Sequence, residues 1–336
     1  MAATAVLGAG SWGTALALLL HENGHDVVLW EFDPEQVKAV IRDGENKKFL
    51  PGVQVPSEIA ITDDLEETLR SRAAVVFAVP SHVVRDVAKR ARELVPGDRL
   101  VVNVAKGIEN GTLMRMSEVL SEELARGEAE LIASLVGPSH AEEVSRKLPT
   151  VVVAAATEEE TAVRVRDLFM TERFRIYTNT DLVGVELGVS LKNVIAIAAG
   201  ICDGLGYGDN TKGALITRGL AEMTRLGVAM GGEPATFAGL SGMGDLITTC
   251  ISGHSRNRYV GEQIASGKTL EQVLESMVMV AEGVRTTRSA VALARQHAVD
   301  MPITEQMHQV LFENKDPSVA ISELMVRDPK PETAGL

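Results

Sequence analysis

The chain has 336 residues, 45% hydrophobic and 24% charged, which are ordinary globular values, and this length favours two domains over a single core. The formal net charge of −13 argues against a nucleic-acid partner, so an anionic ligand would need a local cluster of cations. Two cysteines without a CxxC spacing, and no apolar run near the roughly 18 residues of a membrane span, argue against a disulfide-dependent secreted protein and against membrane insertion. The apolar residues 1–20 have no preceding basic residue and are interrupted by glycines, so we expect no signal peptide and a cytoplasmic location.

Short apolar runs alternate with helical patterns through the first half of the chain. Residues 3–7 are typical of a buried strand, and residues 13–23 of a helix that ends at Gly24. The other expected elements are strands at 26–30, 74–79, 99–104, 131–136 and 150–155 and a helix at 34–43. This alternation predicts an α/β domain with a parallel sheet covered by helices on both faces.

The pattern changes near residue 180, after which we expect no strand. Apolar residues recur at helical spacing in the segments 181–203, 211–230, 256–266, 270–276, 283–297 and 303–314. We therefore expect a dinucleotide-binding domain at residues 1–180 and an all-helical domain at 181–336, whose last ten residues are frayed.

A glycine motif lies directly between the first strand and the first helix. In Gly8-x-Gly10-x-x-Gly13, the first glycine permits a tight turn, the second lets a pyrophosphate approach, and the third lets helix and strand pack closely. The free N–H groups at the helix start favour phosphate. In this context the motif predicts a Rossmann-type dinucleotide site, the alternative being a purely structural turn.

Acidic residues follow the second strand, about twenty residues after the motif. Glu31 or Asp33 would accept hydrogen bonds from the adenine ribose and repel a 2′-phosphate, which favours NAD(H), with NADP(H) left open. Either carboxylate could instead be a solvated loop charge. Phe32 could stack on adenine or serve in packing.

Two lysines attract attention as groups that could reach a substrate. Lys106 follows a buried strand and precedes a glycine, so it could extend into a cleft or remain a solvated surface lysine. Lys192 lies in a helix of apolar and small residues, where a desolvated amine has a lowered pKa and suits proton transfer. A structural lysine that reaches solvent is the alternative for Lys192.

The segment 241–257 offers groups that could accompany these lysines. Asp245 could pair with a buried lysine, cap a helix or carry a surface charge. Ser255 is a good N-cap for a helix that starts with Arg256, and a helix start with an arginine is a ready phosphate site, though an ordinary capped helix has the same pattern. No His, Cys, Asp or Glu set has metal-ligand spacing, so we predict no metal.

Together these segments closely resemble NAD(P)-dependent glycerol-3-phosphate dehydrogenase in its bacterial form, over almost the whole chain. The motifs that carry the resemblance are Gly8-Ala-Gly-Ser-Trp-Gly13, Glu45-Asn-Lys-Lys-Phe-Leu-Pro-Gly52, Lys106-Gly-Ile108, Gly137-Pro-Ser-His-Ala141, Glu186-Leu-Gly-Val-Ser-Leu-Lys-Asn193, Gly242-Met-Gly-Asp-Leu246, Ser255-Arg-Asn257 and Ala281-Glu-Gly283. Their order and spacing together are very specific.

The resemblance implies a fold like that of 6-phosphogluconate dehydrogenase, a homodimer, and reversible reduction of dihydroxyacetone phosphate to sn-glycerol 3-phosphate, a phospholipid precursor. It implies that Lys192 donates the proton. Matching substrate-binding positions are Lys106, Gly137, Ser139, Asn193, Asp245, Ser255, Arg256 and Asn257. Matching cofactor positions are Gly8, Gly10, Ser11, Trp12, Gly13, Glu31, Phe32, Lys106, Ala141, Arg256, Val280 and Glu282.

Two other functions remain as alternatives at this stage. One is a dehydrogenase of the same two-domain plan that acts on a 3-hydroxy acid or a ketopantoate-like substrate, against which the Ser255–Asn257 phosphate pattern argues. The other is a binding protein that senses dinucleotide redox state without turnover, which the presence of Lys192 and Asp245 disfavours.

Overall fold

The computed structural model describes residues 2–125, 131–329 and 331–332. The chain divides into two compact units: unit 1 is Met1–Ala105 with Met116–Leu182, and unit 2 is Lys106–Arg115 with Val183–Leu336. The expected boundary at residue 180 leaves residues 106–115 in the first domain. They belong to unit 2 because Ile108 is buried in its core and Ser289 donates a hydrogen bond to the Ile108 carbonyl.

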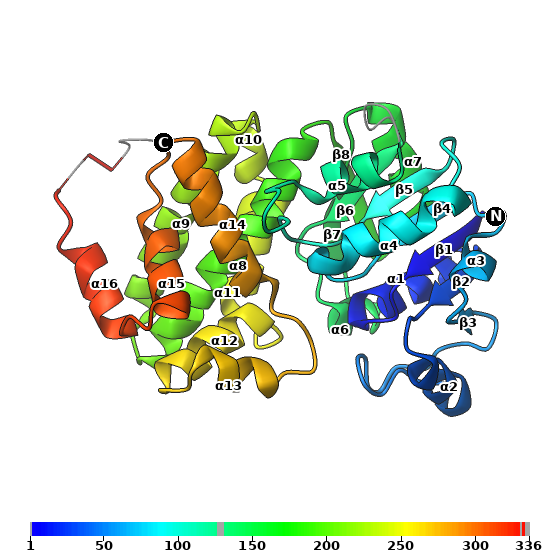
Figure 1. Ribbon diagram of the computed structural model, residues 1–336, viewed down its shortest axis with the longest axis horizontal. Coiled ribbons are helices and arrows are strands. Elements are labelled where there is room, and N and C mark those ends of the chain that lie inside the picture. The colour runs from blue at the N-terminus through cyan, green and yellow to red at the C-terminus, as the bar shows by residue number, and fades with distance from the viewer. Residues whose placement is uncertain (1, 126–130, 330, 333–336) are drawn as a thin grey trace. The chain divides into compact units, whose positions relative to one another are not determined.

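Unit 1 is built on a sheet whose eight strands, within the described residues, run in the order β3-β2-β1-β4-β5-β6-β7-β8 (Figure 1). The strands are β1 (Ala3–Leu7), β2 (Asp26–Trp30), β3 (Ala60–Thr62), β4 (Ala74–Phe77), β5 (Leu100–Asn103), β6 (Ile132–Val136), β7 (Thr150–Ala155) and β8 (Phe174–Asn179). The order of the first six is that of the Rossmann fold, with its switch point between β1 and β4.

The six predicted strands are confirmed, with ends within two residues of those expected. The prediction of a parallel sheet is wrong at one step, since β6 and β7 are antiparallel. Residues 137–149 between them contain only a four-residue helix, which is too little for the crossover that a parallel neighbour needs. β3 and β8 were missed: β3 has three residues, and β8 is an edge strand with Arg175 and Tyr177 exposed.

Helices connect the strands and pack in two rows. They are α1 (Ser11–Glu22), α2 (Pro34–Asp43), α3 (Leu65–Leu69), η1 (Ser81–Val83), α4 (Val84–Ala91), η2 (Arg92–Leu94), α5 (Met116–Glu123), α6 (Ala141–Val144) and α7 (Glu159–Phe169). α1 contacts α6 and α7, whereas α4 contacts α3 and α5. Crossovers on the two sides of the switch point place these rows on opposite faces of the sheet. On one face, strand side chains such as Val6, Val76 and Val102 share a buried core with residues of α1 and α7.

Unit 2 is helical, and apart from one isolated bridge its described residues contain no strand. Its elements are α8 (Leu182–Gly204), α9 (Asp209–Ala229), α10 (Pro234–Phe237), the π-helix η3 (Leu240–Gly244), α11 (Asp245–Ile251), α12 (Arg256–Ala265), α13 (Leu270–Glu275), α14 (Glu282–Gln296), α15 (Pro302–Phe312) and α16 (Pro317–Met325). The predicted helices are confirmed; α10, α11 and α16 are additional.

α8 is the central helix of unit 2. By length and composition it is the one described helix that could cross a membrane. However, 94% of its most apolar 18-residue stretch is buried inside the protein, as in a core helix. Neighbouring helices approach its backbone closely: a Cβ on Gly200 would lie 1.9 Å from the Arg258 carbonyl oxygen of α12. The small residues of α8 therefore allow α12 to pack directly on the segment that follows Lys192 and Asn193.

Candidate active site

The glycine motif forms the predicted turn between β1 and α1. A Cβ on Gly13 would lie 1.9 Å from the Gly8 carbonyl oxygen, and Gly8 has a φ of +109° that favours glycine. A Cβ on Gly10, in contrast, would meet no atom within 4 Å, so this position leaves room beside the backbone. Ser11 and Trp12 lie in the first turn of α1, whose N–H groups no capping side chain satisfies. The turn therefore fits a pyrophosphate.

The three residues after β2 differ in burial and in their contacts. Glu31 is buried and accepts hydrogen bonds from the backbone N–H groups of Ala9 and Asp33, both at 3.2 Å, and burial raises its pKa. Asp33 caps α2 by accepting from Glu35. The solvated-charge alternative is therefore wrong for Glu31. Phe32 is 73% exposed, so its packing alternative is also wrong, and its ring is available to a ligand.

A second turn with sequence-predicted residues follows β6. Gly137 has a φ of +140°, and a Cβ there would lie 3.1 Å from the Val152 Cα. Ser139 donates a hydrogen bond from Oγ to the Gly137 carbonyl at 2.9 Å. Ala141 begins α6 and is buried against Ala15. The sheet thus carries glycine turns with positive φ after β1 and after β6. Both lie at the carboxyl ends of strands, the edge at which a Rossmann sheet binds its ligand.

Lys192 lies on α8 and is only 4% exposed. Its Nζ donates to Asp245 Oδ1 at 2.9 Å and to Thr249 Oγ1 at 2.5 Å. Thr249 in turn donates to the Asp245 carbonyl, one turn back along α11, at 2.6 Å. Thr249 was not predicted as a site residue; its signal in the sequence was the i, i+4 spacing from Asp245, which places both side chains on one face of a helix.

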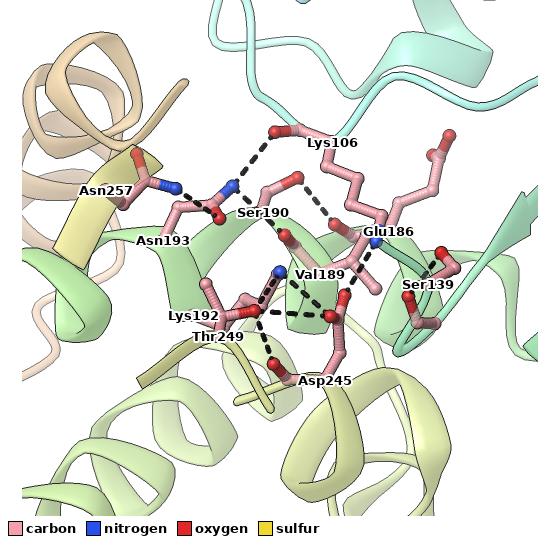
Figure 2. Close-up of polar contacts among 11 residues, drawn as sticks. Lys106, Ser139, Glu186, Val189, Ser190, Lys192, Asn193, Asp245, Thr249 and Asn257 are labelled. Carbon is pink, nitrogen blue, oxygen red and sulfur yellow. Dashed lines mark hydrogen bonds and ion pairs between the residues drawn. The ribbon is translucent and has the colours of Figure 1, made fainter. Parts of the chain in front are cut away.

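Asp245 joins the two predicted lysines (Figure 2). While Oδ1 accepts from Lys192, Oδ2 accepts from Lys106 Nζ at 3.0 Å. Asp245 is 2% exposed, and the side chain of Lys106 is largely covered. The readings of Asp245 as a surface charge and of Lys106 as a solvated lysine are therefore wrong. Unit 2 holds two ammonium groups on one buried carboxylate.

This arrangement perturbs the proton affinity of each group. Burial lowers the pKa of Lys192 to about 8; the attraction of Asp245 opposes this shift and the repulsion of Lys106 adds to it. Burial by itself would raise the pKa of Asp245, but the two lysines hold it below its usual range. Lys192 can therefore exchange a proton near neutral pH, while Asp245 stays ionised.

Two asparagines lie beside this cluster and bond to one another. Asn193 donates from Nδ2 to the Lys106 carbonyl at 3.2 Å, and its Oδ1 accepts from Asn257 Nδ2 at 2.8 Å (Figure 2). Asn257 Oδ1 accepts the Gly283 N–H at 2.9 Å. Both asparagines are buried, so they tie α8 to the first turns of α12 and α14.

The start of α12 confirms the predicted cap. Ser255 Oγ accepts the N–H of Arg258 at 3.2 Å, and Arg256 is exposed at the first helical position. Val280 and Glu282 are half-buried, just before and at the start of α14. In unit 2, hydrogen bonds therefore link Lys106, Asn193 and Asn257, and they link Lys192 with Asp245. Among the described residues, no His, Cys, Asp and Glu group could hold a metal ion.

The strand order, the glycine turn and the helical second unit with its buried lysine define a class of two-domain Rossmann-type proteins with an all-helical second domain. Family models identify the member: residues 3–162 match the NAD-dependent glycerol-3-phosphate dehydrogenase N-terminus, and residues 181–322 match its C-terminus. The chain belongs to the NAD-dependent glycerol-3-phosphate dehydrogenase family.

Individual relatives agree with this assignment. The chain is 56% identical over 323 residues to glycerol-3-phosphate dehydrogenase (NAD(P)+) of Pelotomaculum thermopropionicum, which covers 96% of this chain and 93% of the relative. The crystal structure of glycerol-3-phosphate dehydrogenase from Coxiella burnetii superposes with a TM-score of 0.92 at 38% identity, covering 97% and 99% of the two chains. A ketopantoate reductase from Ralstonia eutropha, at 14% identity and a TM-score of 0.60 over 95% of this chain and 99% of its own, shares the fold alone.

Proposed function

We propose that this protein reversibly reduces dihydroxyacetone phosphate to sn-glycerol 3-phosphate with a nicotinamide dinucleotide. The observation that carries the proposal is the buried Lys192–Asp245–Lys106 cluster in a chain of this family. A ketone that becomes an alcohol needs a proton at its oxygen, and a partly titrated ammonium in a dry site supplies one.

Lys192 serves as the proton donor in reduction and as the base in oxidation. Asp245 orients the Nζ of Lys192 through the hydrogen bond at 2.9 Å, and Thr249 accepts a second hydrogen bond from the same Nζ. Lys106, on the other oxygen of Asp245, stabilises negative charge that grows on the substrate oxygen. The nicotinamide, when bound, supplies the hydride to the ketone carbon.

The start of α12 binds the substrate phosphate. The first-turn N–H groups of a helix lack intrahelical acceptors, and the exposed Arg256 side chain adds a cation there. This phosphate site also distinguishes the substrate from a non-phosphorylated keto acid. Because the chain carries 46 acidic and 33 basic side chains, this local cation matters more than the overall field.

The cofactor binds at the turns of unit 1. Gly10 leaves space for the pyrophosphate, and the buried Nε1 of Trp12 has no hydrogen-bond partner among the described residues, as expected of a group that meets a ligand. The carboxylate of Glu31 at the end of β2 and the absence of arginine from 31–41 favour NAD(H) over NADP(H).

The cellular setting is part of the proposal. The enzyme acts in the cytoplasm as a homodimer and supplies glycerol 3-phosphate for phospholipid synthesis. The free, buried cysteines Cys202 and Cys250 suit a reducing compartment. Light scattering during size-exclusion chromatography measures the oligomeric state.

The test is an initial-rate assay that follows oxidation of NADH and NADPH with dihydroxyacetone phosphate. We expect turnover with this substrate, a higher kcat/KM with NADH, and a loss of roughly 10²-fold or more in Lys192→Met with NADH binding retained. Preference for a ketopantoate-like acid, or NADH binding without any turnover, would instead support the two alternatives.

A further inference from the structure

The segment Lys106–Arg115, hereafter the arm, is a hairpin that enters unit 2 from the end of β5. Its two sides pair through an antiparallel bridge between Ile108 and Arg115, and the Glu109 N–H donates to the Met114 carbonyl at 2.9 Å. Lys106 stands at its beginning, and Arg115 at its end. The bridge therefore ties Arg115 directly to Ile108, two residues after Lys106.

Two residues on one face of α8 form hydrogen bonds with the two ends of the arm. Glu186 and Asn193 are seven residues apart, two helical turns, and so project from the same side. Glu186 accepts from Arg115 Nη1 at 2.9 Å, and Asn193 donates to the carbonyl of Lys106 at 3.2 Å. Lys192 lies between Glu186 and Asn193 on the same helix. The backbone of α8 therefore carries Lys192 itself and also the two residues that hold the arm of Lys106.

The Arg115–Glu186 ion pair is buried, with side chains 12% and 5% exposed. A third attachment comes from α14: Ser289 Oγ lies 2.5 Å from Asn110 Oδ1 and 3.2 Å from the Ile108 carbonyl. Ile108 itself is buried in the helical core. Buried ion pairs add little to stability compared with apolar residues of similar volume, so this pair calls for another reason to be there.

We propose that the arm is a positioning element, and that the Arg115–Glu186 ion pair sets where the Lys106 ammonium stands beside Asp245 and Lys192. This inference rests on the proposed function and adds Arg115, Glu186 and Ser289 to it as positioning residues. None of the three is assigned a contact with substrate; each acts through Lys106.

A double-mutant cycle tests the proposal. Arg115→Met, Lys106→Ala and their combination are compared by kcat/KM for dihydroxyacetone phosphate. If Arg115 acts through Lys106, Arg115→Met lowers kcat/KM roughly 10- to 100-fold, as displacement of a reacting group by about 1 Å does, and the combined variant is no worse than Lys106→Ala. Losses that multiply overturn the proposal, as does an Arg115→Met enzyme with kcat/KM within about twofold of wild type.

A matched control separates positioning from general damage. Arg72 in unit 1 matches Arg115 in burial, with a side chain 14% exposed, and it pairs at 2.9 Å with Asp26, whose side chain is 62% exposed. Arg72→Met is expected to leave kcat/KM within about twofold. Should Arg115→Met fold poorly because Glu186 is left buried and unpaired, Arg115→Met with Glu186→Leu removes both charges and keeps the volume, which buried pairs tolerate.

A second readout does not depend on turnover. The rate at which acetic anhydride acetylates Lys106, followed by mass spectrometry, reports how firmly its amine is held. Arg115→Met is expected to raise this rate at least about fivefold while the exposed Lys268 is unchanged; an unchanged Lys106 rate overturns the proposal. If Arg115→Met shows this labelling difference but the wild-type protein does not reduce dihydroxyacetone phosphate, the proposed function is contradicted and the positioning role of the arm is still supported.

Discussion

Asp245→Asn changes the proton affinity of Lys192 in a direction that the structure defines. Lys192 has a pKa of about 8 because burial lowers it and Asp245 partly restores it. A hydrogen bond to a charged partner contributes about 1.5–3 kcal/mol, so its removal lowers the Lys192 pKa by about one to two units. At pH 7.5, the protonated fraction then falls from about three quarters at a pKa of 8 to about a tenth at 6.5, an eightfold loss of the proton donor.

The pH profile of kcat/KM measures this change, because it reports groups of the free enzyme. For reduction, wild type is expected to lose activity above a pKa of about 8, and Asp245→Asn above a value one to two units lower. Oxidation needs the neutral amine, so its profile rises through the same values. Asp316→Asn, which alters an exposed cap of α16, serves as the control. An inflection that stays in place or moves upward in Asp245→Asn would refute the assignment of Lys192 as the titrating group.

Four further substitutions have outcomes that the structure determines. Gly10→Ala is expected to retain the fold but lose NADH affinity in fluorescence titration, whereas Gly13→Ala also lowers the melting temperature, since its Cβ would lie 1.9 Å from a carbonyl oxygen; equal effects would contradict the roles given to the two glycines. Arg256→Ala is expected to raise KM for dihydroxyacetone phosphate by roughly 10- to 100-fold at an unchanged melting temperature, and an unchanged KM would exclude it as the phosphate anchor. Glu222 accepts the N–H groups of Ile303 and Thr304, and burial raises its pKa to about 7. Because the native state then binds a proton that the unfolded state releases, the free energy of unfolding falls by about 3 kcal/mol from pH 4.5 to 7, and Glu222→Gln should remove that slope in urea titrations.

Local signals were sufficient for most of the fold. Six strands are continuous apolar runs, and the long helices of unit 2 have their own periodicity, so each could be read without its neighbours. The three-residue β3 and the exposed edge β8 form because a neighbouring strand offers hydrogen bonds, which no local pattern records. The antiparallel step from β6 to β7 likewise depends on the path of the chain through space.

For the site, the sequence by itself determined which chemical groups are present and favoured a desolvated Lys192, because the residues around it in the helix are apolar or small, with a lysine that reaches solvent as the alternative. Only the tertiary structure decided its partners: Thr249 on a second helix, the shared carboxylate of Asp245, and the arm that carries Lys106 into the helical unit. The physical reason is that burial follows from local hydrophobicity, whereas the proton affinity of the buried Lys192 amine depends on charges within a few ångströms, and those come from Asp245 and Lys106, about 50 to 90 residues away in the chain.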